Sequence, residues 1–208
     1  DNGLLHAPDV YMDKIAVGGG LPEGVVDLDK PVSENLKALS EAKGKPLAEM
    51  MVCVLDRPRH AKLIAEIREM GVGVVLIGDG DVAGVIATTD PKTGIDMYIG
   101  SGGAPEGVLA AAALRCIGGQ MQGRLLFRNA DEKARAHKWG ITDLDRKYNL
   151  MDLASGDVIF AATGVTDGSL LRGVHWEPEG VTTETLIMRS KTKTVRRVHA
   201  IHGPGGAK

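Results

Sequence analysis

Two arginines flank Pro58 in the stretch DRPRH, which directly follows a run of apolar residues of strand length. The guanidinium groups of Arg57 and Arg59 each offer a planar fork of donors that suits a doubly charged phosphate. The alternative is that both cations are only solvated on the first turn of the next helix. Because cations are slightly unfavourable at a helix N-terminus, we favour phosphate binding. We interpret the adjacent His60 as a packing or helix-surface residue.

Two aspartates flank a glycine in the stretch GDGD, where Asp79 and Asp81 lie on either side of Gly80 and again follow an apolar run. Aspartate caps helices well, so the pair could form only a turn and a helix start. Alternatively, the carboxylates accept hydrogen bonds from sugar hydroxyls or help to hold a divalent cation. The stretch by itself supports both interpretations equally.

The stretch GSGGAPEGVLAAAALR, residues 100–115, has the composition of a helix that begins at an anion-binding loop. Gly102 and Gly103 permit tight or left-handed backbone, and Pro105 suits the first position of a helix. Free amides at a helix start attract anions, so the acidic Glu106 in the same turn is unexpected. Glu106 either complements the helix dipole or holds a cation beside a phosphate. P-loop and dinucleotide fingerprints are missing, so neither ATP nor NAD is indicated.

Each of these three stretches follows an apolar run and precedes a segment with helical character. The runs are MMVCVLD at 50–56, VGVVLIG at 72–78 and IDMYIG at 95–100. Apolar strands alternating with helices are typical of α/β proteins in which helices cover a mostly parallel sheet. Ligands of such sheets bind at the carboxyl ends of the strands. We therefore expect the chemistry to lie in residues 56–60, 78–81 and 100–106.

The rest of the chain adds further expected elements. They are a strand within 9–20, a helix within 31–46, helices within 57–71 and 79–88, a strand at 121–127, a helix within 129–140 and a buried strand at 158–165. Ser33 and Asn129 are the expected N-caps, and Gly44 is the expected stop of the first helix. Residues 182–202 alternate over two segments joined by a polar turn, which predicts an antiparallel hairpin.

These elements predict a layered α/β fold with a mixed, mostly parallel sheet, flanking helices and a C-terminal antiparallel hairpin. Residues 1–180 are the expected α/β region, which would bind a small phosphorylated and hydroxylated ligand. Residues 181–202 are the expected hairpin, and residues 203–208 a flexible tail.

Composition narrows the possible partners and compartments. Apolar residues make up 43% of 208, enough for a sizeable core, and aromatic residues only 3%, so the core should be aliphatic. A formal net charge of −2 does not indicate electrostatic binding to nucleic acid or to an anionic membrane. No apolar run reaches transmembrane length, and no signal peptide is visible. Cys53 and Cys116 lie in apolar stretches, so we interpret them as buried free thiols of a cytoplasmic protein.

Several motifs, in this order along the chain, resemble those of one enzyme family. They are APDVYMDKIAVG, DRPRH, GDGDVA, GGAPEGV, NADEKARAHKWGI, IFAATGVTDGSLLRGV and TTETLIMRSKTKTVRRVH. Together they are similar to the class II fructose-1,6-bisphosphatases of the GlpX type, some of which also act on sedoheptulose-1,7-bisphosphate. The resemblance runs across essentially the whole chain. It implies the layered α/β fold of sugar phosphatases and inositol monophosphatases.

The resemblance also implies an activity and a set of site residues. Enzymes of this family remove the 1-phosphate of a sugar bisphosphate by attack of a water molecule that Mg²⁺ or Mn²⁺ activates. Carried onto this sequence, the substrate-binding residues would be Tyr11, Arg57, Pro58, Arg59, Asp79, Gly80, Asp81 and Gly103, and Glu106 would be a metal ligand. The resemblance further favours a homo-oligomer.

One part of the family pattern is not found in this sequence. A D-P-x-x-G-T type motif with the catalytic threonine, and most of the metal-binding acids, would stand before Asp1. We therefore expect the chain to be the C-terminal part of such an enzyme, incomplete for catalysis by itself, with its hairpin packing toward the N-terminal half. The alternative function is a non-catalytic sugar-phosphate-binding or regulatory module that kept the pocket and lost the metal acids.

Overall fold

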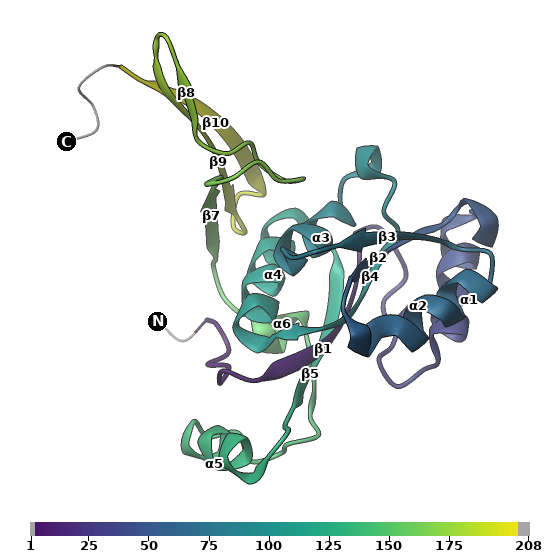
Figure 1. Cartoon of the computed structure of the whole chain (residues 1–208). Helices are drawn as coiled ribbons and strands as arrows, with labels where there is room; N and C mark the ends of the chain where they lie inside the picture. The colour runs from purple at the N-terminus through teal and green to yellow at the C-terminus, as the bar shows by residue number, and fades with distance from the viewer. Residues whose placement is uncertain (1–2, 204–208) are drawn as a thin grey trace.

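The computed structural model describes residues 3–203, which form two β-sheets and six α-helices (Figure 1). Residues 204–208, which make up most of the tail that we predicted to be flexible, lie outside the described residues. Among the described helices, none combines the length and the apolar character needed to cross a membrane.

The larger sheet has six strands in the order β3-β2-β4-β1-β5-β6. Their bounds are β1 Tyr11–Val17, β2 Met51–Leu55, β3 Gly73–Ile77, β4 Met97–Gly103, β5 Gln120–Leu126 and β6 Lys147–Asn149. Strands β2, β3 and β4 are parallel to one another, β1 is antiparallel to both β4 and β5, and β6 is antiparallel to β5. Four of the six strands therefore point the same way, which confirms the predicted mixed and mostly parallel sheet.

Helices cover both faces of this sheet (Figure 1). Their bounds are α1 Val32–Lys43, α2 Ala61–Glu69, α3 Asp81–Ala87, α4 Ala104–Ile117, α5 Ala130–Lys138 and α6 Leu150–Leu153. Helices α1 and α2 pack on one face, whereas α3, α4 and α6 lie on the other. Alternate side chains of β1 pack on opposite faces of the sheet. Ile15 and Val17 belong to the core under α1 and α2, and Met12 and Ala16 belong to the core under α4.

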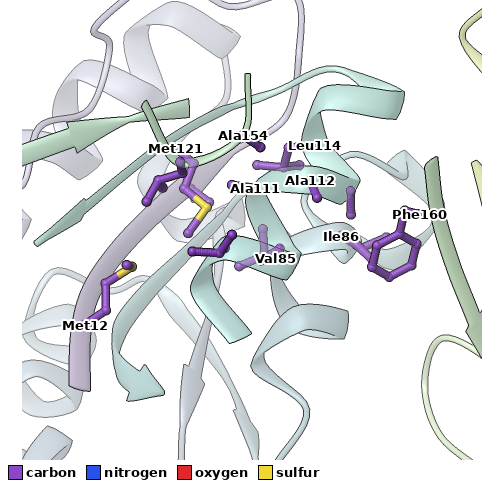
Figure 2. Close-up of a cluster of buried hydrophobic side chains, with 14 of the residues drawn as sticks. Met12, Val85, Ile86, Ala111, Ala112, Leu114, Met121, Ala154 and Phe160 are labelled. Atoms are coloured by element: carbon purple, nitrogen blue, oxygen red, sulfur yellow. The ribbon is translucent and has the colours of Figure 1, made fainter. Parts of the chain in front are cut away.

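Helix α4 lies between the two sheets, and its composition fits that position. It contacts strands of the larger sheet and also β7 and β9 of the smaller one. A helix that is apolar on all sides is a buried helix, and residues 110–113 are four buried alanines. Figure 2 shows this helix together with Met12 and Met121 from the larger sheet, Val85 from α3 and Phe160 from β7. Small side chains let α4 approach all of these neighbours closely.

The smaller sheet is antiparallel and contains the predicted hairpin. Its strands are β7 Ile159–Thr163, β8 His175–Glu177, β9 Gly180–Arg189 and β10 Thr194–His202. The order is β10-β9-β7, with β8 also paired to β9. Strands β9 and β10 pair from Arg189 and Thr194 at the turn to Val181 and His202, which confirms the hairpin. In Figure 1 the strands β8, β9 and β10 extend away from the larger sheet.

Two predicted helix signals are confirmed and one is wrong. Gly44 ends α1 in the left-handed region with φ 61°, and Asn129 caps α5 by accepting a hydrogen bond from the backbone N–H of Glu132. Ser33, however, does not cap α1. The helix begins one residue earlier, after Pro31, and no side chain caps it.

Two predictions about strands are also wrong. Residues 100–103 are not a loop but the end of β4, because they pair with residues 11–14 of β1. The strand at 158–165 is not fully buried, since Ile159 is 67% exposed. Its strand β7 lies at an edge of the smaller sheet, where one side lacks a neighbouring strand.

Candidate functional site

The predicted site residues lie around one pocket at an edge of the larger sheet. Strands β2, β3 and β4 end there and the antiparallel β1 begins there, so residues far apart in the sequence meet. The pocket has a volume of about 280 Å³ and is lined by Tyr11, Leu55, Arg57, Arg59, Asp79, Gly80, Asp81, Gly102, Gly103 and Glu106. Of the residues predicted to bind substrate or metal, only Pro58 does not line it.

Arg59 is held in place by β4 and by an aromatic ring. Its Nε donates to Ser101 Oγ at 2.9 Å, and its Nη2 donates to the Ser101 carbonyl oxygen at 2.7 Å. The guanidinium carbon lies 4.8 Å from the centroid of the Tyr11 ring, within cation–π range. These contacts leave Nη1 available for a ligand while fixing the plane of the guanidinium.

Arg57 is held less firmly. Its Nη1 donates to the Asp56 carbonyl oxygen at 2.8 Å, and the side chain is half-buried. The exposed Pro58 follows at the first position of a one-turn 3-10 helix, Pro58–His60. Proline suits this position because its fixed φ matches a helix start and no backbone donor is lost there. Pro58 therefore shapes the turn between the two arginines rather than the pocket wall.

His60 is a packing residue, as we expected. It is 4% exposed, and its Nε2 accepts a hydrogen bond from the backbone N–H of Ser101 at 2.9 Å. The proton must then lie on Nδ1, which donates to the Leu55 carbonyl oxygen at 2.8 Å. A neutral imidazole held at both nitrogens ties the end of β2 to β4 and has no free lone pair for catalysis.

The GDGD stretch forms the turn into α3, but its aspartates do not cap the helix. Gly80 occupies the N-cap position in the left-handed region with φ 74°, and no side chain caps α3. Asp79 is exposed at the mouth of the pocket, whereas Asp81 is 8% exposed. Both residues line the pocket, and the interpretation of the pair as helix caps is wrong because neither carboxylate caps α3.

Lys14 is a residue of this site that sequence reasoning missed. Its side chain is 1% exposed, and its Nζ forms an ion pair with Asp81 and donates to the Gly103 carbonyl oxygen at 3.0 Å. The available signal was its position on β1, since Lys14 follows Met12 and precedes Ala16 on the face that packs under α4. A lysine at such an inward position needs an acidic partner.

Arg128 is a second residue that was missed. Its guanidinium carbon lies 5.1 Å from the centroid of the Tyr11 ring, which Arg59 also contacts. Glu132 binds the same guanidinium through Nε at 2.9 Å and Nη2 at 2.6 Å. These hydrogen bonds lower the pKa of Glu132 and keep it ionised, so Arg128 is fixed beside Tyr11.

Glu106 lies in the first turn of α4, and Gly103 makes room for its carboxylate. A Cβ on Gly103 would lie 1.9 Å from Glu106 Oε2, so any other residue at position 103 would displace the Glu106 carboxylate. Glu106 is exposed, and within residues 3–203 it has no ion pair or hydrogen bond. Its carboxylate oxygens are therefore free to bind a cation or a donor in the pocket.

The carboxylates of the pocket do not by themselves form a metal centre. Within residues 3–203 there is no group of three or more His, Cys, Asp or Glu side chains that could hold a metal ion. Mg²⁺ and Mn²⁺ prefer octahedral sets of oxygen ligands, and Asp81 already shares its carboxylate with Lys14. The described residues thus supply two uncommitted acids, the exposed Asp79 and Glu106, and not a complete ligand set.

The cysteines take no part in this pocket. Cys53 and Cys116 are buried free thiols, as predicted. Burial raises the pKa of Cys53 to about 11, so its thiol stays protonated near neutral pH. Cys53 instead lines a larger pocket of about 490 Å³ between α3 and the smaller sheet, whose walls are mostly apolar. That pocket lacks the gathered charges of the strand-end pocket.

Comparison with known proteins identifies the family of this chain. The family described as bacterial fructose-1,6-bisphosphatase, glpX-encoded, matches residues 1–202. The chain is 43% identical over 219 residues to the D-fructose 1,6-bisphosphatase class 2/sedoheptulose 1,7-bisphosphatase of Trichodesmium erythraeum strain IMS101, covering 99% of this chain. It is 44% identical over 213 residues to the fructose-1,6-bisphosphatase 1 class 2 of Escherichia coli strain K12, covering 96% of this chain.

The chain spans 63% of the length of each of these relatives. The match nevertheless extends over nearly all of the chain and includes every strand end that lines the pocket. The chain therefore belongs to the glpX-encoded family of bacterial fructose-1,6-bisphosphatases.

Proposed function

We propose that this chain forms the sugar-bisphosphate-binding part of a phosphatase that converts fructose 1,6-bisphosphate to fructose 6-phosphate and phosphate. The observation that carries this proposal is the gathering of two arginines, two aspartates and Glu106 around one pocket at the strand ends. Guanidinium groups match phosphate oxygens, and carboxylates accept hydrogen bonds from sugar hydroxyls. Family membership supports the same assignment.

Each pocket residue has a proposed role. Arg57 and Arg59 bind a phosphate group, with Pro58 setting the turn between them and Tyr11 stacking on Arg59. Asp79 and Asp81 accept hydrogen bonds from hydroxyl groups of the sugar, and Gly80 and Gly103 let the ligand approach the backbone. Glu106 is one ligand of a divalent cation, for which we propose Mg²⁺ or Mn²⁺. Because residues 3–203 supply no complete ligand set, we assign no chemical step to the metal.

The test is phosphate release by the protein produced from its complete coding sequence, with fructose 1,6-bisphosphate as substrate and Mg²⁺ or Mn²⁺ present. We expect release of one phosphate per sugar and much slower hydrolysis of fructose 6-phosphate. Sedoheptulose 1,7-bisphosphate should be assayed beside it, because one relative is named for both activities. No hydrolysis of either bisphosphate would contradict the proposal.

A second candidate function is a non-catalytic sugar-phosphate-binding or regulatory module. The observation in its favour is the lack of a metal-binding group within the described residues. Such a module would bind fructose 1,6-bisphosphate without releasing phosphate, so binding and hydrolysis must be measured separately. We further propose a cytoplasmic homo-oligomer that does not bind nucleic acid or membranes, which light scattering and cell fractionation can test.

A further inference from the structure

We propose that Lys14 is a positioning residue of the strand-end pocket, which fixes the Asp81 carboxylate and the Gly103 carbonyl group relative to each other. The identity of the ligand, a sugar bisphosphate, rests on the proposed function. The positioning itself rests only on the geometry described below, so the two can be tested separately.

Lys14 joins two segments that are distant in sequence and meet at the pocket. Its Nζ pairs with Asp81 at the start of α3, and it donates to the Gly103 carbonyl oxygen at 3.0 Å, where β4 passes into α4. Asp81 and Gly103 both line the pocket, and Glu106 follows Gly103 by three residues. One ammonium group thus sets the spacing between α3 and the turn that carries Glu106.

A contribution to stability alone does not account for this lysine. Burying an ion pair costs desolvation energy, and apolar residues of similar volume are often as stable in its place. The neighbouring inward residues of β1, Met12 and Ala16, are apolar and fully buried. An apolar residue at position 14 would continue this pattern, so the ion pair indicates a requirement for the exact location of Asp81.

Lys14 also changes the charge that a phosphate would meet. Asp79, Asp81 and Glu106 all line the pocket, and three carboxylates would repel an anionic ligand. The buried ammonium group of Lys14 offsets the charge of Asp81 at direct contact. Asp81 can then accept a hydrogen bond from a sugar hydroxyl without adding a full negative charge beside a phosphate.

Gly102 provides independent support, because it leaves room for the ion pair. A Cβ at Gly102 would lie 2.6 Å from Asp81 Oδ2 and 3.1 Å from Lys14 Nζ. The backbone of Gly102 is not in the left-handed region, so alanine is conformationally allowed there. Gly102→Ala therefore displaces the ion pair by steric contact alone and removes neither charge.

The first experiment tests the positioning without any ligand. Amide hydrogen exchange is compared between the wild-type chain, Lys14→Met and Gly102→Ala. Both variants should exchange at least about 10-fold faster than wild type at residues 80–84 and 103–107, because the contacts that hold these segments are lost or displaced. Residues 51–55 of β2 should be unchanged. Wild-type exchange rates at both segments in Lys14→Met would overturn the inference.

The second experiment measures the consequence for binding by titration calorimetry with fructose 1,6-bisphosphate. Loss of a charge-assisted contact should weaken binding about 10- to 100-fold in Lys14→Met, and Gly102→Ala should weaken it in the same direction. Gly73→Ala on β3, away from the pocket, is the matched control, since its Cβ would lie 2.7 Å from Cε of Met51 on β2. It should bind as wild type does.

The two proposals fail in different ways. If the wild-type chain binds no fructose 1,6-bisphosphate, the proposed ligand is wrong, and hydrogen exchange still decides whether Lys14 positions the segments. If wild type binds and Lys14→Met binds equally well, the positioning role is wrong whatever the ligand does. Weaker binding by Gly73→Ala, to the same extent as Gly102→Ala, would show a general effect of destabilisation and would also contradict the inference.

Discussion

At the scale of single residues, a substitution of Glu106 distinguishes its two possible roles, interaction with the helix dipole and binding of a cation. Glu106→Gln keeps the size of the side chain and removes its charge. If the carboxylate binds a catalytic cation, phosphate release should fall by about 100-fold or more, since metal stabilisation of a phosphoryl group is worth several kcal/mol. The melting temperature should hardly change, because Glu106 is exposed and a dipole contact contributes only about 0.3–1 kcal/mol.

Calorimetric titration with Mn²⁺ gives a readout for Glu106 that does not depend on turnover. Glu106→Gln should weaken Mn²⁺ binding, whereas the control Glu69→Gln, an exposed carboxylate at the end of α2, should not. Retention of most activity and of Mn²⁺ affinity in Glu106→Gln would leave only the dipole role.

Arg57 tests the phosphate assignment at the neighbouring strand end. Arg57→Ala removes a half-buried guanidinium that lines the pocket and is held by one backbone contact. If it binds a phosphate equally in ground and transition states, KM should rise about 10- to 100-fold with a smaller change in kcat. Arg68→Ala, an exposed arginine on α2, is the control. An unchanged KM would mean that Arg57 is only solvated at the helix start.

The residues that could be predicted from the sequence share one property. Arg57 and Asp79 directly follow apolar runs, and Glu106 lies in the glycine-rich stretch after the third run, so the strand-end rule for parallel sheets points to them. Lys14 does not follow a run but lies inside a strand. Arg128 follows the strand predicted at 121–127, but its contact with Tyr11 depends on the pairing of β1 with β5. Neither contact is encoded by local spacing, so both required the fold.

At the scale of elements, Asp96 joins helix α1 to the strands β2 and β4. Its carboxylate is 4% exposed and pairs with Lys43 Nζ at 2.6 Å and Lys45 Nζ at 2.7 Å. It also accepts a hydrogen bond from the Met51 amide at 2.9 Å. Burial tends to raise the pKa of Asp96, but the hydrogen bonds from both lysines and from Met51 outweigh it and lower the pKa below its ordinary value of 3.8.

A lowered pKa in the folded state makes the stability contribution of Asp96 dependent on pH. The contribution is fully present above the unfolded pKa and is lost as the pH falls through the folded pKa. Asp96→Asn should therefore lower the free energy of unfolding by about 1–3 kcal/mol at pH 7 and by less at pH 3. Urea unfolding at both pH values measures this. An equal loss at pH 7 and pH 3 would contradict the electrostatic role.

The length of an element decided how well its sequence predicted it. The long apolar or periodic segments of β2, α2 and α4 carry enough residues to show a pattern, and the structure confirms them. Strands β6 and β8 have three residues each, which is too short for periodicity, and were not predicted. Glycines at 100, 102 and 103 are typical of turns and predict a loop, whereas in the structure they make room for His60, Asp81 and Glu106 at the end of β4.

At the scale of the whole molecule, the smaller sheet presents apolar surface that the described chain leaves open. Ile159 on β7 is 67%, Val165 just after β7 is 78% and Trp176 on β8 is 81% exposed. The apolar pocket of about 490 Å³ lies between this sheet and α3. The relatives are longer than the aligned region, which spans 63% of their length. We predict that further polypeptide in such proteins covers this sheet, in line with the expected packing of the hairpin.

Binding of the dye ANS to the 208-residue chain tests this prediction, because ANS fluoresces on accessible apolar surface. We expect clear fluorescence at a temperature where the chain is folded. The double variant Ile159→Thr, Val165→Thr should reduce it with little change in melting temperature, since both side chains are exposed. Leu109→Gln, a 48% exposed leucine on α4, is the control and should leave the signal largely unchanged. A compact, monomeric chain without ANS fluorescence would contradict this prediction, because the smaller sheet and its hairpin would then be stable in contact with solvent.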